Sequence, residues 1–185
     1  MEIVKFVLAG VFFLVSASHA GAQDARIAPF LGTYVGEVVF ATDQGLEKRE
    51  LDVRIQAEGD GFSVQWSTVR QKIGGKVKKS THFVAFGNPD RNGVFLPKGS
   101  IERFGEKIAI DPLQGRPQLW ATVRGKTLVI NATVQTDRGG LEKQIYERKL
   151  VPGGLELNFL RTRDGQPLKS LHVKMKTKNQ KQNLQ

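Results

Sequence analysis

Apolar and polar side chains alternate with a period of two residues along most of the chain from residue 32 onward. This period is typical of β-strands with one buried and one solvated face. In the first such stretch, 32–40, Tyr34 and Phe40 share a face, and the stretch 51–56 alternates even more regularly. The pattern therefore predicts a chain of strands that opens at residue 32.

Turn motifs divide the rest of the chain into further short strands. Strands are predicted at or near residues 62–66, 76–86, 94–96, 107–110, 119–123, 128–134, 141–150, 155–159 and 171–175. Asn92-Gly93, Gly125-Lys126 and Asp164-Gly165 lie between such runs, and Asp-Gly in particular favours a type I′ hairpin. The connections are therefore predicted to be consecutive antiparallel hairpins.

Consecutive hairpins with few helical segments predict an all-β fold. The expected architecture is an antiparallel up-and-down β-barrel of about 8–10 strands, closed by pairing of the last strand with the first. A two-sheet β-sandwich is the alternative, and the run of short hairpins favours the barrel. An outer-membrane barrel is disfavoured because the second strand face carries charges such as Asp52 and Arg54, where lipid would require apolar side chains.

The first 22 residues are predicted to be a signal peptide rather than part of the fold. An apolar run at 6–15 is followed by small residues at 16–22, which fits cleavage before Gln23, with cleavage after Ala20 as the alternative site. An uncleaved membrane anchor is the competing interpretation. We therefore expect a periplasmic or secreted protein with one barrel domain at 23–176 and a disordered basic tail at 177–185. The sequence contains no cysteine, so the core must hold this fold without disulfides.

The net charge of +10 adds the possibility of an anionic partner. The basic residues that would contact such a partner lie around the tip at 73–75 and along the last strand: Arg70, Lys72, Lys76, Lys78, Lys79, Lys174 and Lys176. A merely solvated face is the other interpretation of both clusters. Nucleic acid is disfavoured as a partner because aromatic side chains do not alternate with these charges.

Two short motifs resemble those of a known superfamily. Gly32-Thr33-Tyr34 resembles the Gly-x-Trp opening of the calycins, which include lipocalins and fatty-acid-binding proteins, with Tyr in place of Trp. The stretch 125–148 is similar to the late hairpins of lipocalin-like bacterial proteins. The resemblance implies a barrel with an Arg packed over the opening aromatic. Arg148 or Arg161 would then contact Tyr34, and Gly32, Tyr34 and Arg148 would form a structural seam.

Reactive groups for an enzyme are scarce. Apart from the signal peptide, the histidines are His82 and His172, and the Asp residues fall in turns, where they are used for backbone reasons. No catalytic residue, metal site or cofactor is therefore predicted. His172 resembles the haem-ligating histidine of the nitrobindins, but the strand period turns it outward beside Lys174 unless a bulge reverses that orientation.

The leading functional hypothesis is a non-enzymatic barrel that binds a hydrophobic or amphipathic small molecule in its interior. The cavity candidates are large aromatic residues of the predicted strands: Tyr34, Phe40, Phe62, Trp66, Phe83 and Phe159. The same residues could instead fill the interior, since small barrels are often packed solid. The alternatives are an envelope protein that docks anionic lipid or polysaccharide through its lysines, and a haem-binding barrel that uses His172.

Overall fold

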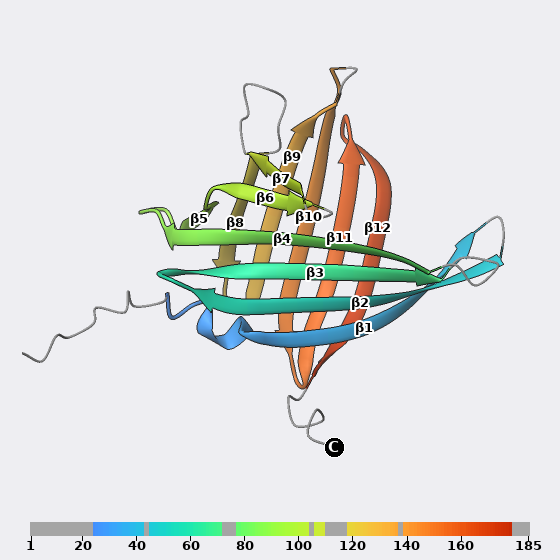
Figure 1. Ribbon diagram of the computed structural model, residues 1–185, viewed down its shortest axis with the longest axis horizontal. Coiled ribbons are helices and arrows are strands. Elements are labelled where there is room, and N and C mark those ends of the chain that lie inside the picture. Colours follow the sequence, from blue (N-terminus) through green and yellow to red (C-terminus); the bar gives the residue numbers. More distant parts are fainter. Residues whose placement is uncertain are drawn as a thin grey trace, which may run out of the picture.

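The computed structural model (Figure 1) describes residues 24–42, 45–71, 77–103, 106–109, 118–136 and 139–178. Several predictions concern parts of the chain outside these residues. They are the signal peptide at 1–22, the lysines Lys72 and Lys76, and the tail from residue 179; the side chain of Phe40 is likewise outside what is described.

The described chain is built from strands, preceded by one short 3₁₀ turn. The elements are η1 (Ala28–Phe30), β1 (Gly32–Thr42), β2 (Gly45–Glu58), β3 (Gly61–Gln71), β4 (Val77–Pro89), β5 (Val94–Pro97), β6 (Ser100–Arg103), β7 (Glu106–Ala109), β8 (Gln118–Arg124), β9 (Thr127–Gln135), β10 (Leu141–Val151), β11 (Gly154–Arg163) and β12 (Gln166–Thr177). In this part of the chain no helix is long and apolar enough to cross a membrane. The strands predicted from the alternating pattern are confirmed, and β6 is an additional one.

Ten of these strands close into a ring. Its order is β3-β2-β1-β12-β11-β10-β9-β8-β5-β4, and β4 pairs with β3 to complete it, while β6 and β7 form a hairpin beside β4. In Figure 1, β1 to β4 run across strands β8 to β12, so the ring has two walls at a steep angle. The predicted antiparallel up-and-down barrel is confirmed, and the closed ring excludes the sandwich alternative.

The barrel closes where the first strand meets the last, as predicted. Tyr34 pairs with Thr177 and Val35 with Lys176, and the Lys178 amide donates to the Thr33 carbonyl over 2.7 Å. At the entry to β1, Gly32 has a φ of +152°, a conformation that L side chains rarely adopt. This brief ladder joins the two walls of the barrel.

Tyr34 closes the barrel beside this ladder. Its ring is buried, and its hydroxyl donates to the Phe30 carbonyl over 2.9 Å. A Cβ at Gly32 would lie 3.3 Å from that hydroxyl oxygen. The structure thus places two of the three predicted seam residues at the closure, whereas the guanidinium of Arg148 lies over Trp66 and Tyr146.

An apolar core fills one half of the barrel interior. Its large buried aromatics include Phe30, Phe62, Phe86 and Phe95, and the Phe62 ring stacks on Phe86 at 4.9 Å and meets Phe95 edge-on at 5.2 Å. Each fully buried side chain of this kind contributes roughly 1.5–3 kcal/mol of transfer free energy. This half of the barrel is therefore packed with the protein's own side chains.

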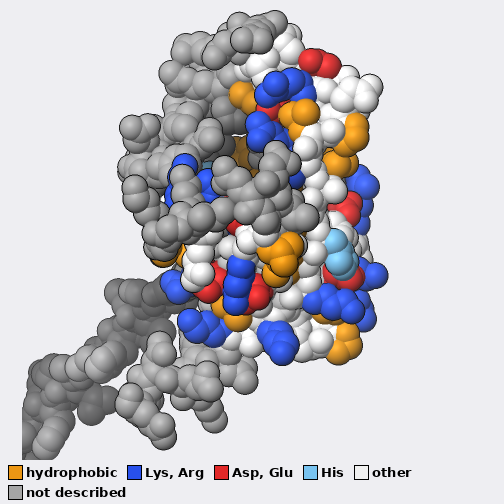
Figure 2. Space-filling view, turned by 90° about the vertical axis from the view of Figure 1, so that its right-hand side faces the viewer, with side chains coloured by type: hydrophobic (Ala, Val, Ile, Leu, Met, Phe, Trp, Pro, Cys, Tyr) orange, Lys and Arg blue, Asp and Glu red, His pale blue; other side chains and the backbone are white. Residues whose placement is uncertain are grey.

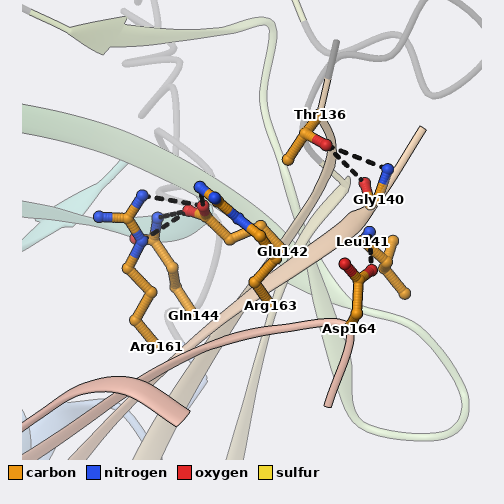
Figure 3. Close-up of polar contacts among 8 residues, drawn as sticks. All are labelled: Thr136, Gly140, Leu141, Glu142, Gln144, Arg161, Arg163 and Asp164. Atoms are coloured by element: carbon orange, nitrogen blue, oxygen red, sulfur yellow. Dashed lines mark hydrogen bonds and ion pairs between the residues drawn. The ribbon is translucent and has the colours of Figure 1, made fainter. Parts of the chain in front are cut away.

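The turn chemistry predicted from the sequence is visible in the backbone. Asp164 has a φ of +49° and Gly165 a φ of +81°, which is the pair of positive values that a type I′ turn requires. The Asp164 carboxylate also accepts the Leu141 amide over 2.7 Å (Figure 3). In the loop before β5, the Asp90 carboxylate accepts the amides of Asn92 and Val94, each over 2.9 Å. These aspartates therefore stabilise the turns by accepting hydrogen bonds from backbone amides.

Candidate functional site

Four rings cross the interior of the barrel from wall to wall. Trp66 on β3 and Tyr146 on β10 belong to strands that are five positions apart in the ring in either direction, yet their ring centroids are 5.4 Å apart. His82 stacks on Trp66 at 5.2 Å, and Phe159 contacts Tyr146 at 4.7 Å. We call these four residues the aromatic row. Because the row joins opposite walls, it forms the boundary of the packed core.

The inner faces of several strands change character across the aromatic row. On β3, the inward series runs from Phe62 and Val64 on the core side to Thr68 and Arg70 beyond Trp66. The same change occurs along β4, β11 and β12, whose inward positions turn from apolar to polar or basic toward one end. The period-two pattern continues, so these polar side chains face inward even though the hydrophobic signal has ended.

These polar positions line an open recess of about 340 Å³. Its lining residues are Arg49, Thr68, Arg70, Lys78, Ser80, His82, Arg161 and Lys169. Figure 2 views the molecule from the right-hand side of Figure 1 and shows Lys and Arg side chains among hydrophobic and acidic ones on the described surface. The described lining contains five basic side chains and no acidic one. We call it the cationic recess.

Two carboxylates at the edge of the recess hold part of this positive charge in place. Glu47 forms a short hydrogen bond with Arg49 and lies 3.6 Å from Arg70. Glu142 accepts two hydrogen bonds from Arg161, from Nε and Nη2, each of 2.8 Å (Figure 3). The bidentate contact with Glu142 fixes the guanidinium of Arg161 in a defined position. Three of the five lining cations, Arg49, Arg70 and Arg161, are thus in contact with a carboxylate.

Glu142 is the most strongly perturbed carboxyl of the site. The hydrogen bond from Arg161, opposed by partial burial, lowers its pKa to about 2, and Gln144 and Arg163 act in the same direction as Arg161. Gln144 donates to Glu142 over 3.0 Å and accepts from the Tyr146 hydroxyl over 2.9 Å. A hydrogen-bonded chain therefore runs from the mouth of the barrel to the aromatic row and positions Tyr146.

Lys169 shows that positive charge is concentrated in the recess. Burial lowers its pKa below the ordinary value, and repulsion from Arg49 adds to that effect. The guanidinium groups of Arg161 and Arg70 contribute in the same direction, while Glu47 opposes them. Like charges close together favour the neutral form of an amine. An anion bound here would relieve this repulsion.

Arg148 lies on the core side of the aromatic row and is 1% exposed. Its guanidinium carbon is 5.3 Å from the Tyr146 ring centroid and 5.8 Å from that of Trp66. Its Nε and Nη1 atoms have no hydrogen-bond partner among the described residues. Burial lowers its pKa to about 10. The two rings are therefore the stabilising contacts that the structure provides for this charge.

The predicted cavity residues fall into three groups. Tyr34 and Phe62 are buried in the core, whereas Trp66 and Phe159 belong to the aromatic row. Phe83 shares its face of β4 with Thr81, which bonds Ser67 on the outside, so the prediction that it lines the cavity is wrong. The physical reason is the two-residue period of the strand, which points its neighbour His82 inward.

The predicted basic clusters are divided between the two faces of the barrel wall. Arg70 and Lys78 line the cationic recess. Lys79, Lys174 and Lys176 face outward, where they line a groove of about 840 Å³ together with acidic residues. Those acidic residues are Glu37, Glu50 and Asp52. Adjacent lysines in the sequence therefore belong to different surfaces.

His172 lies on the outer face of β12, as the strand period predicts. Its side chain is 57% exposed, Nδ1 lies 2.6 Å from the Asn158 side-chain oxygen, and Nε2 lies 3.2 Å from Glu156. It therefore does not point into the barrel. No group of three or more His, Cys, Asp or Glu in the described part of the chain is placed to hold a metal ion.

Sequence reasoning did not assign Arg49, Arg161 or Lys169 to an interior site. The signal was present, because counting every second residue from Leu51, Phe159 and Leu171 leads to these three positions. No protein-family model matches the chain, and a search of curated proteins finds no relative. The site must therefore be interpreted from its own geometry.

Proposed function

We propose that this chain is an exported calycin-like barrel that binds an amphipathic small molecule in its open half and does not act on it chemically. The main support for this proposal is that the basic recess borders the aromatic row, whose His82 belongs to the lining and stacks on Trp66. The recess volume of about 340 Å³ lies at the lower end of the range for small-molecule sites. The ligand is accordingly small.

The two surfaces suit the two halves of an amphipathic molecule. His82 lines the recess and stacks on Trp66, and these rings offer flat area against which a ring or short alkyl segment packs. Arg70, Lys78 and Lys169 supply charge for an anionic group. On the other side of the row, buried apolar side chains fill the interior. The site thus favours contact on the row over burial in the core.

Export rests on the sequence of the first 22 residues, and the calycin-like assignment on the closed barrel with its Gly32-x-Tyr34 entry. Expression with residues 1–22 intact, followed by fractionation and N-terminal sequencing, tests export. A mature protein that starts at Gln23 in the periplasm or medium supports it, whereas an intact cytoplasmic chain contradicts it.

Binding is tested by titration with 8-anilino-1-naphthalenesulfonate, an amphipathic anion, followed by calorimetry. We expect saturable one-to-one binding that Trp66→Ala weakens by about tenfold, the loss expected for one aromatic contact of roughly 1.4 kcal/mol. Trp120, on the outer side of the wall, provides the matched control, and Trp120→Ala leaves the affinity unchanged. Equal losses in both variants, or no saturable binding, would refute the proposal.

A second candidate function rests on the outer groove. Lys79, Lys174 and Lys176 line it from β4 and β12, which supports docking to anionic lipid or polysaccharide. We expect such binding to weaken steeply as salt rises, because exposed charges are screened over about 8 Å at physiological ionic strength. Flotation with vesicles of anionic and of zwitterionic lipid tests it. Equal partitioning to both kinds of vesicle would exclude it.

A further inference from the structure

The cationic recess has more positive charge than a singly charged ligand requires. Arg49, Arg70, Lys78, Arg161 and Lys169 line it, and among the described residues Glu47 and Glu142 are the carboxylates that contact these cations. Both carboxylates lie at the edge, outside the lining itself. Counted over the described residues, the recess therefore presents five positive charges beside two carboxylates.

The remaining polar groups of the lining are suited to oxygen-rich anions. Thr68 and Ser80 lie side by side in the β3–β4 ladder and carry hydroxyl groups on the inner face. Arginine, lysine and hydroxyl groups all donate hydrogen bonds, and a guanidinium can donate two parallel bonds to one phosphate. Arg161 is already oriented by its bidentate contact with Glu142.

We infer that the recess recognises a phosphoryl group, and that the ligand of the proposed function is a small aromatic or short-chain phosphomonoester rather than a carboxylic acid. A phosphomonoester carries between one and two negative charges near pH 7 and three terminal oxygens. It matches the excess charge and the number of donors better than a carboxylate with one charge and two oxygens. The inference rests on the proposed function, because it requires a ligand in the open half of the barrel.

The two faces of one strand provide a matched pair of variants. Lys78 and Lys79 are neighbours on β4 and both are exposed, but Lys78 lines the recess and Lys79 lines the outer groove. On β12, the half-buried Lys169 lines the recess and the exposed Lys174 lines the outer groove. The double variants Lys78→Gln/Lys169→Gln and Lys79→Gln/Lys174→Gln therefore remove equal charge from opposite sides of the wall.

Calorimetric titration with 1-naphthyl phosphate, 1-naphthoate and 1-naphthol separates the headgroup from the ring. We expect the phosphate to bind about tenfold more tightly than the carboxylate, and the neutral naphthol most weakly. The inner double variant should lose at least tenfold in affinity for the phosphate, while the outer one changes it by less than about twofold. Thermal unfolding of both variants checks that they fold, and the single variant Lys78→Gln replaces the inner pair if it does not.

The other outcomes separate this inference from the function it rests on. Equal affinity for phosphate and carboxylate, or equal losses in the two double variants, would overturn the phosphoryl assignment while leaving an amphiphile-binding barrel. Inorganic phosphate or pyrophosphate binding as tightly as the naphthyl ester would support phosphoryl recognition but contradict an amphipathic ligand. If none of these compounds bound, both the inference and the proposed function would be wrong.

Discussion

Replacement of Arg148 by methionine is expected to stabilise the protein. Arg148 is fully buried on the core side of the aromatic row, and its Nε and Nη1 have no hydrogen-bond partner among the described residues. Burial lowers its pKa from the ordinary value of an arginine to about 10. At roughly 1.4 kcal/mol per pKa unit, the charged form is disfavoured by about 3 kcal/mol in the folded state.

Part of this cost is offset by the two rings beside the guanidinium. Each cation–π contact contributes roughly 0.5–1 kcal/mol, and more where the charge is desolvated. Methionine retains an unbranched apolar stem and can pack against Trp66 and Tyr146. The net expectation for Arg148→Met is a gain of about 1 kcal/mol in the free energy of unfolding, or roughly 2–4 °C in Tm.

The measurement is urea unfolding at pH 7, with Arg148→Ala as the contrasting variant. Alanine also removes the charge but leaves a cavity, so it should be less stable than Arg148→Met by about 2 kcal/mol or more. Since burial lowers the pKa of this base, the unfolded chain binds more protons than the folded one from about pH 10 up to the ordinary pKa of arginine. The contribution of Arg148 to stability therefore rises with pH there, and the methionine variant lacks that rise.

A loss of more than about 1 kcal/mol in Arg148→Met at pH 7, with no difference from Arg148→Ala, would refute this reasoning. It would mean that the favourable contacts of the guanidinium outweigh the free-energy cost of its desolvation. A neutral result for methionine together with a large loss for alanine would confirm that the aliphatic stem, rather than the charge, fills the site.

Three further predictions concern other parts of the barrel. Glu142→Gln should lower the free energy of unfolding by about 2 kcal/mol at pH 7. Because the pKa of Glu142 is lowered to about 2, this difference is complete above pH 4.5 and fades as the pH falls through 2. Acid titration of both proteins measures it. Gly61→Ala should lower the free energy of chemical unfolding by about 2 kcal/mol or more, because its Cβ would lie 1.9 Å from the Phe86 carbonyl oxygen. Gly87→Ala should lower it only slightly, because the new Cβ meets a flexible lysine side chain. His172→Ala should leave any haemin-induced Soret spectrum unchanged, since this histidine faces solvent.

The fold was largely predictable because side chains of a barrel strand alternate between the interior and the exterior with a period of two residues. The alternation in 51–56 predicts the inner face of β2, and the Asp164-Gly165 pair predicts a hairpin whose two central residues have positive φ. The same period also determines that Phe83 faces outward, opposite His82. That assignment required only strict use of the sequence pattern.

The candidate site was predicted only in part. Trp66 and Phe159 were expected inside, but periodicity does not state which side chains meet across a barrel, and Tyr146 was not expected to contact Trp66 from the opposite wall. The inward basic residues were missed for a different reason. Arginine and lysine at the end of a strand are expected at the surface on grounds of hydration, and only closure of the ring turns that end into a recess.

The local elements of this protein follow from the order of its residues, which sets where side chains alternate, where the chain turns, and which face of each strand is apolar. These follow from interactions between residues close in the chain. The tertiary structure decided which distant strands face each other, that one half of the interior is packed and the other open, and that Lys78 and Lys79 lie on opposite surfaces of one wall. These properties depend on closure of the barrel, which brings residues such as Arg70 and Lys169 around one recess.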